Sequence, residues 1–172
     1  MGSPFQIIQD EEHYTRVVEG GILRAKKYAR IATANVKDLR VRRGKRYISI
    51  VSEFERLADR GVSIRILHSG RPSGPFRESL DSRPALARSP RFEMMYCPRS
   101  HMKMVIVDGD FLYTGSANLT GAGLGVKNPN RRNLEVGFIT SDSAVIRSFE
   151  EIFDRSWNNE LCEACAMKEY CE

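Results

Sequence analysis

The strongest candidates for chemistry in this sequence are His101 and Lys103. They lie two positions apart, directly before the apolar run at 104–107. In a strand, this spacing places both side chains on one face of a sheet. A histidine can act as a nucleophile or as an acid, and a lysine is a fixed cation. The pair therefore suits a reaction at an anionic group, of which a phosphate ester is the natural candidate.

A turn follows the apolar run at Asp108 and Gly109, and a second apolar run comes after it. Both residue types tolerate the positive φ of a type I′ turn, so the sequence predicts a two-residue hairpin. In that register His101 lies opposite Ser116, and Asn118 lies on the same face if the strand continues. A three-residue loop would shift the pairing by one residue and separate these side chains.

The residues of this region resemble the HKD motif of the phospholipase D superfamily at every defined position and spacing. The matching residues are His101, Lys103, Asp108, Gly115, Ser116 and Asn118. The resemblance implies a phosphodiesterase that works through a phosphohistidine on His101. Lys103 would neutralise nonbridging oxygens, while Ser116 and Asn118 would donate hydrogen bonds. Gly115 would allow close approach of a ligand, and Asp108 would support the site indirectly.

A carboxylate that orients an active-site histidine also occurs in members of the superfamily. Glu135 lies 34 residues after His101 and is the only acidic residue of the strand expected at 133–138. The resemblance therefore implies that Glu135 fixes the tautomer of the imidazole. The alternative is a surface glutamate on an edge strand.

The motif occurs only once in the chain. Cleavage through a covalent intermediate needs a nucleophile on one side of phosphorus and an acid on the other. A two-fold homodimer would bring a second copy of the patch face to face with the first. We therefore expect a composite site in which one His101 attacks phosphorus and its twin protonates the leaving oxygen. Lysines and hydrogen-bond donors would stabilise the charge, so we expect no catalytic metal.

Charge is distributed unevenly along the 172 residues, whose net charge is +5. Residues 141–172 hold eight acidic and three basic side chains, which leaves a net charge of +10 on residues 1–140. A basic surface favours a polyanion such as nucleic acid, although anionic lipid would also suit it. The sequence has no apolar run of membrane-spanning length and no signal-peptide core, so we expect a cytoplasmic protein.

The basic residues are densest at 37–46, where six of ten residues are Lys or Arg. We expect this stretch to be a loop between a strand and a helix. It is either a solvated loop or a patch that follows phosphates and supplies nonspecific affinity. Charge alone does not choose between DNA, RNA and lipid. The candidates for nucleic-acid binding are Arg40, Arg42, Arg43, Lys45 and Arg46.

Four cysteines have the spacing of metal ligands, with Cys97 far upstream of a C-terminal C-x2-C-x5-C formed by Cys162, Cys165 and Cys171. The arrangement resembles the iron-sulfur staple of AddAB-type repair nucleases, which have a different nuclease fold. The resemblance covers these four residues only and implies a structural 4Fe-4S cluster. Zinc suits four thiolates too, and reduced thiols or disulfides remain open. A cluster would attach the tail at 158–172 to the start of the catalytic strand.

The order of the expected elements indicates an α/β fold. A strand at 30–36, an amphipathic helix at 47–60 and a strand at 62–68 predict a right-handed crossover and a parallel pair. Further helices are expected at 11–29 and after 141, with a long loop at 69–91 that holds at most a short helix near 76–80. We expect one domain over residues 1–172, with a mixed, mainly parallel sheet and helices on both faces.

The expected function is that of an endonuclease with limited sequence preference, because the basic charge suits nucleic acid. A phospholipase or cardiolipin hydrolase could use the same site. A nucleic-acid-binding module that docks its ligand without cleavage is the alternative from another class, although such a module would not need His101.

Overall fold

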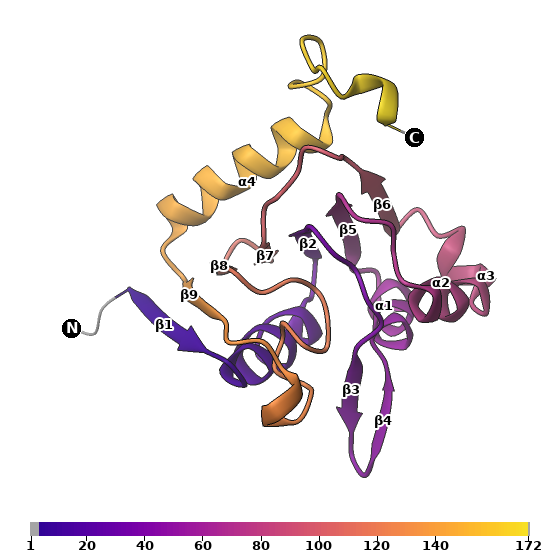
Figure 1. Ribbon diagram of the computed structural model, residues 1–172, viewed down its shortest axis with the longest axis vertical. Coiled ribbons are helices and arrows are strands. Elements are labelled where there is room, and N and C mark those ends of the chain that lie inside the picture. Colours follow the sequence, from indigo (N-terminus) through magenta and orange to yellow (C-terminus); the bar gives the residue numbers. More distant parts are fainter. Residues whose placement is uncertain (1–3, 172) are drawn as a thin grey trace.

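A computed structural model describes residues 4–171, so residues 1–3 and 172 of the expected domain lie outside the described part. The chain forms a seven-stranded sheet (Figure 1). In spatial order its strands are β1 (Phe5–Gln9), β9 (Val136–Thr140), β8 (Phe111–Gly115), β7 (Met104–Val107), β2 (Tyr28–Thr33), β5 (Ser63–His68) and β6 (Phe92–Tyr96).

The sheet is mixed, as the sequence predicts. Strand β5 pairs in parallel with β2 and β6, whereas the other four pairings are antiparallel. Following the directions across the sheet, only β7 and β9 run against the other five strands. The prediction of a mainly parallel sheet is therefore confirmed for strand direction.

Helices cover both faces of this sheet (Figure 1). Alternation along β2 separates the two cores, because Ala29 and Ile31 belong to one hydrophobic cluster and Ala32 to the other. The first cluster packs against α1 (Ile50–Asp59), α2 (Gly74–Asp81), α3 (Pro84–Ala87) and the short helices η1 (His13–Glu19) and η2 (Ile22–Arg24). The second packs against α4 (Ser143–Trp157).

Helix α4 begins where the sequence places it. The Asp142 carboxylate accepts hydrogen bonds from the backbone N–H groups of Ala144 and Val145, which caps the first turn. Its apolar side includes Phe153, which is fully buried and stacks on Trp157. Burial of a side chain like Phe153 is worth about 1.5–3 kcal/mol. This helix is therefore part of the core. Each helix of residues 4–171 is too short or too polar to span a bilayer.

The basic stretch is a hairpin, and the prediction of a loop at 37–46 was wrong. Strands β3 (Arg40–Arg43) and β4 (Arg46–Ser49) pair antiparallel and extend beyond the main sheet (Figure 1). Gly44 has a φ of +60°, which suits the tight turn. Val41 and Ile48 pair with each other, and the buried Val41 joins the core. The charged residues concealed this alternating pattern.

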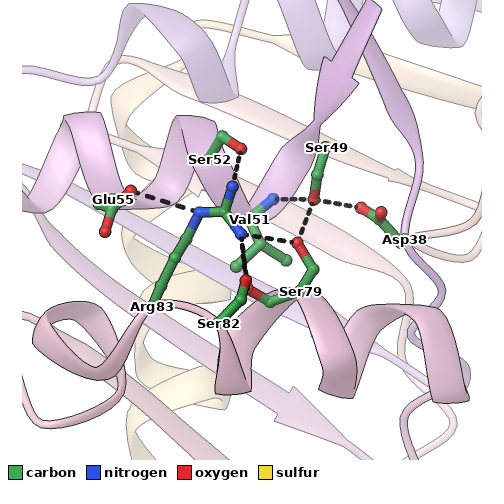
Figure 2. A network of polar contacts seen from close by, with 8 residues as sticks. All are labelled: Asp38, Ser49, Val51, Ser52, Glu55, Ser79, Ser82 and Arg83. Atoms are coloured by element: carbon green, nitrogen blue, oxygen red, sulfur yellow. Dashed lines mark hydrogen bonds and ion pairs between the residues drawn. The ribbon is translucent and has the colours of Figure 1, made fainter.

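The segment 69–91 contains α2 and α3 rather than one long loop. Ser73 caps α2, and Phe76 anchors it in the core. Figure 2 shows how Arg83 joins these helices to α1: its guanidinium donates to the Ser79 carbonyl at 2.6 Å and to the Ser52 hydroxyl at 2.7 Å. It also pairs with Glu55 at 3.3 Å. Proline and serine therefore serve here as helix starts and caps, a role that their composition alone did not reveal.

The expected helix at 11–29 is divided in two. The π-helix η1 ends at Gly20, and η2 begins after Gly21. A side chain at Gly21 would meet the ring of Phe111 at 2.7 Å, so the glycine allows η1 and η2 to pack closely on the sheet. The remaining short helices are η3 (Pro129–Arg131) and η4 (Lys168–Tyr170).

Candidate active site

The motif residues that flank β7, β8 and β9 gather at one edge of the sheet. Strands β7 and β9 run against β2 and β8, so the starts of β7 and β9 lie at the carboxyl ends of β2 and β8. His101 and Lys103 precede β7, Ser116 and Asn118 follow β8, and Glu135 precedes β9. In α/β proteins the carboxyl edge of the sheet is the usual place for a ligand site.

The predicted hairpin register is wrong by one residue. Thr114 pairs with Met104 instead of Lys103, because the connection is a three-residue loop. Asp108 and Gly109 both have a positive φ, as expected, but Asp110 joins them in the loop. The shift does not disperse the site, since His101, Lys103 and Ser116 lie just beyond the regular strands and are not fixed to one strand face.

Lys103 lies directly against His101. Its ammonium nitrogen Nζ is 3.2 Å from Nδ1 and 3.3 Å from Nε2 of the imidazole, and it donates to the His101 carbonyl at 2.9 Å. Partial burial lowers the pKa of Lys103, and the nearby Glu135 carboxylate opposes that shift. The imidazole itself is exposed. A cation and a nucleophile are therefore side by side and open to a ligand.

Glu135 and Ser116 form the other half of this cluster. The Ser116 hydroxyl donates to the Glu135 carboxylate and accepts from the Val136 N–H at 3.1 Å. Asn133 donates to the same carboxylate at 2.9 Å. Within residues 4–171, no hydrogen bond joins Glu135 to His101. The expected contact between the carboxylate and the imidazole is therefore not made inside one described chain.

Asn118 is held by its side-chain oxygen. That oxygen accepts from the Asn35 N–H at 3.0 Å and from the Thr33 hydroxyl at 3.2 Å, both at the end of β2. The amide nitrogen of Asn118 donates no hydrogen bond within the described chain, and it has two N–H groups to offer. The contact to β2 thus fixes the orientation of a donor at the edge of the site.

The packing of β8 against β9 explains why residue 115 is a glycine. A Cβ at this position would lie 2.6 Å from the Cα of Gly137 and 2.7 Å from the Tyr113 hydroxyl. The pairing of β8 with β9 therefore requires a glycine here, whereas the sequence analysis explained the residue by the approach of a ligand.

Asp108 lies at the opposite edge of the sheet. Its carboxylate accepts hydrogen bonds from the backbone N–H groups of Lys26, Lys27 and Tyr28 at 2.7–2.8 Å. Tyr28 begins β2, whose other end carries the site. Asp108 therefore acts through the fold and does not contact the catalytic cluster.

All five basic candidates have exposed side chains, but one of them is engaged in an ion pair. Arg43 makes two hydrogen bonds to Glu53, which is buried in α1. This contact raises the pKa of Arg43 and makes it a structural partner. The other four candidates are Arg40, Arg42, Lys45 and Arg46. At the base of the hairpin, the Lys37 N–H donates to the Leu119 carbonyl, which connects it to the segment after Asn118.

All four cysteines line one cavity of about 240 Å³, together with His101. Each is a free thiol. The Arg99 guanidinium contacts Cys165 and lowers the pKa of that thiol. In residues 4–171, no three His, Cys, Asp or Glu side chains are close enough to hold a single metal ion.

His13 was not predicted from the sequence. It is fully buried in η1, with Nδ1 3.0 Å from the Asp10 carbonyl and with Nε2 unpartnered. Asp10 in turn accepts from the Glu135 N–H at 3.1 Å. Burial lowers the pKa of His13. His13 lies in a helical region without any motif spacing, so only the tertiary structure reveals its link to Glu135.

The sheet and the motif at its carboxyl edge define a phospholipase D-like domain. The family described as "Cardiolipin synthase, PLD-like domain" matches residues 20–157, and the chain belongs to this family. No curated protein matches the sequence significantly.

Two proteins of known structure share the fold with this chain over almost their whole length. Nuc from Salmonella typhimurium, a phospholipase D family member, has a TM-score of 0.62 and 23% identity, over 90% of this chain and 93% of Nuc. NucT from Helicobacter pylori has a TM-score of 0.60 and 17% identity, over 88% of this chain and 94% of NucT. The phosphatidylserine synthase of Haemophilus influenzae matches with a TM-score of 0.59 and 14% identity, over 88% of this chain and 38% of the synthase.

Proposed function

We propose that this protein is a phosphodiesterase, and specifically an endonuclease, that cleaves DNA or RNA through a phosphohistidine. The observation that carries the proposal is the cluster of His101, Lys103, Ser116 and Glu135 at one edge of the sheet. Membership of the phospholipase D-like family supports the same chemistry.

In the proposed first step, His101 attacks phosphorus and forms the phosphohistidine. The leaving oxygen takes a proton from an acid on the opposite side, and water then attacks the intermediate to release the phosphate product. Lys103 neutralises the nonbridging oxygens, and the amide N–H groups of Asn118 donate hydrogen bonds that strengthen as charge develops. Ser116 donates as well once its hydroxyl turns from Glu135 to the substrate. These groups supply the electrostatic stabilisation, so we propose cleavage without a catalytic metal.

The acid on the opposite side is the His101 of a second copy, which makes the enzyme a homodimer. The surface beside Glu135 supports this part of the proposal, since Leu134 is 90% exposed and Val136 is 55% exposed. Exposed apolar residues around a charged site suit burial against a partner. In such a dimer Glu135 orients an imidazole across the interface, which agrees with its lack of contact to His101 within the described chain.

The basic hairpin favours nucleic acid as substrate. Arg40, Arg42, Lys45 and Arg46 give a flexible, exposed set of cations that can follow a phosphate backbone. TrmBL2, described as an archaeal chromatin protein with a novel mode of DNA binding, shares the fold with a TM-score of 0.60 and 16% identity, over 90% of this chain and 52% of TrmBL2. The rival substrate is a phospholipid, because the family description names cardiolipin synthase.

To test the proposal, the purified protein is incubated in the presence of a chelator with labelled single- and double-stranded DNA and RNA, and with cardiolipin vesicles. We expect turnover of a nucleic acid and none with His101→Asn. Arg147→Ala, an exposed change on α4, is the control and keeps full activity. Turnover of cardiolipin alone would replace the nuclease proposal, and activity that returns only with added magnesium would contradict the mechanism.

The composite site has its own test. Co-expression of equal amounts of wild type and His101→Asn gives random dimers, of which about one quarter contain two wild-type chains. A composite site therefore leaves about one quarter of the activity. Two independent sites would leave about one half, and that result would overturn the shared site.

A further inference from the structure

The four cysteines form a site of their own beside the catalytic edge. Cys97 is 65 residues away from Cys162 in the sequence, yet both line the cavity of about 240 Å³ with Cys165 and Cys171. Figure 1 shows the tail after α4, drawn in yellow, beside the connection between β6 and β7 that carries Cys97. Four thiols in one cavity are more than the packing of a short tail requires.

The backbone of the tail repeats every three residues. The N–H of Cys162 bonds the carbonyl of Asn159 at 3.0 Å, and the N–H of Cys165 bonds the carbonyl of Cys162 at 3.1 Å. Lys168 bonds back to Cys165 and Cys171 bonds back to Lys168, both at 3.2 Å. These turns keep the tail compact, and Cys162, Cys165 and Cys171 line the same cavity.

The walls of the cavity also suit an anionic inorganic group. Arg99 lines the cavity and offers a cation against the four sulfurs. The hydroxyl of Ser100, another lining residue, is buried and has no hydrogen-bond partner in the structure. A buried hydroxyl without a partner costs free energy unless a further group satisfies it.

We propose that this cavity binds a 4Fe-4S cluster through Cys97, Cys162, Cys165 and Cys171. Tetrahedral zinc would require sulfur atoms about 3.8 Å apart, given a zinc–sulfur bond of about 2.3 Å. The thiols in residues 4–171 do not approach closely enough for a single ion. A cubane cluster takes one thiolate at each of four irons, so it needs more widely spaced thiolates and fills more of the cavity. Ser100 would donate its unpaired hydroxyl to a sulfur of the cluster.

The cluster attaches the tail to the loop that carries His101. The tail has little core of its own: Leu161 is 47% exposed and Tyr170 is 59% exposed. A short segment with so little buried apolar surface gains stability from a metal or a covalent link. Ser100, His101 and Met102 line the same cavity, so the cluster supports the approach to β7. Only this effect on His101 rests on the proposed function.

The direct test is the metal content of protein purified under nitrogen. We expect about four irons and four acid-labile sulfides for each chain, and visible absorption that bleaches with dithionite. Cys97→Ser and Cys165→Ser should each lose most of the iron. Ser156→Ala changes a non-thiol residue of the same cavity and should keep it. One zinc for each chain, or iron-free protein after reconstitution with iron and sulfide, would overturn the proposal.

A second measurement follows the tail itself. Hydrogen exchange of the holoprotein should show protection in residues 158–171 and 97–102, and this protection should be lost in Cys97→Ser. His101→Asn should keep both the iron and the protection while losing turnover. Because cluster binding is read without activity, the iron-sulfur site and the phosphodiesterase proposal can fail independently of each other. Equal hydrogen exchange of the tail in the presence and absence of iron would contradict the proposal that the cluster holds the tail in place.

Discussion

The catalytic edge and the cysteine tail lie side by side but are stabilised differently. The catalytic edge is built on β2, β7 and β8, whose core residues are buried on both faces of the sheet. The tail at 158–171 has exposed side chains and one short helix, η4. The sheet can therefore hold the site residues without a ligand, whereas the tail would depend on the cluster that we propose for its thiols.

The difference shows that the reactive groups and the groups that stabilise the fold can lie in separate parts of one chain. At the catalytic edge, polar groups are left exposed on a stable sheet, so their replacement should change activity more than stability. In the tail, the expected cost of losing a cysteine is local unfolding, with little effect on the core. Asp108 shows a third case, since it belongs to the motif but supports the sheet.

The largest expected effect is the loss of turnover in His101→Asn. Removal of a nucleophile that also serves as the acid should lower kcat by at least about 10³-fold. The side chain is exposed, so the melting temperature should stay within about one degree of wild type. Single-turnover cleavage and thermal unfolding measure the two quantities. If the His101→Asn protein were unfolded, His101 would be needed for the fold. That result would contradict the separation of the catalytic groups from the residues that stabilise the sheet.

The second prediction concerns Asp108→Ala, which should destabilise the fold. Three backbone N–H groups lose a charged acceptor, and water replaces it only in part, so we expect a loss of about 2–4 kcal/mol in the free energy of unfolding. Urea denaturation measures this loss. Asp108→Asn keeps one acceptor oxygen and should cost less. If Asp108→Ala kept full stability but had a reduced kcat, Asp108 would instead take part in the reaction.

The motif, the main strands and the terminal helix could be predicted from the sequence because each depends on local pattern. The strand expected at 62–68, which is β5, and the helix expected after 141, which is α4, are examples. The hairpin register could not be predicted, since Asp108 and Gly109 fit both a two-residue turn and the start of a three-residue loop. In the structure β8 also pairs with β9, a tertiary contact that the local pattern does not contain.

Elements that form only through contacts with residues distant in the sequence could not be predicted either. Strand β1 exists through its antiparallel pairing with β9, and the sequence analysis did not expect it. The hairpin β3–β4 was hidden by its charges. His13 belongs to no motif, and it is connected to Glu135 by contacts that both residues make with Asp10. The cysteine spacing, by contrast, led to an expected cluster whose four members do line one cavity.

The third prediction tests whether the hairpin binds nucleic acid. Replacement of Arg40, Arg42, Lys45 and Arg46 by Gln in the His101→Asn background should weaken binding about 10- to 100-fold and reduce the salt slope by about three to four. Fluorescence anisotropy at several salt concentrations measures both. The control changes Arg56, Arg60, Arg77 and Arg88, four exposed residues, with the same loss of charge. Equal weakening in both variants would show that net charge, and not the hairpin, governs binding.

The smallest expected effect concerns His13 and the pH dependence of stability. Burial lowers the pKa of His13 in the folded state, while the Asp10 carbonyl and the Asp10 and Glu135 carboxylates oppose the shift. The unfolded chain therefore binds a proton more readily than the folded chain below about pH 6.5. The folded state should lose stability as the pH falls through this range, and it should keep that stability above it.

His13→Phe removes the titrating group but keeps a ring against Tyr113, whose ring centroid is 5.3 Å from that of His13. We expect this variant to lose less stability than wild type between pH 7 and pH 5, measured by urea denaturation at both values. Ser156→Ala provides the control, because it replaces a side chain that carries no titratable group. If the slope of His13→Phe equals that of wild type, the acid sensitivity arises from other groups, and His13 supports Glu135 by packing alone.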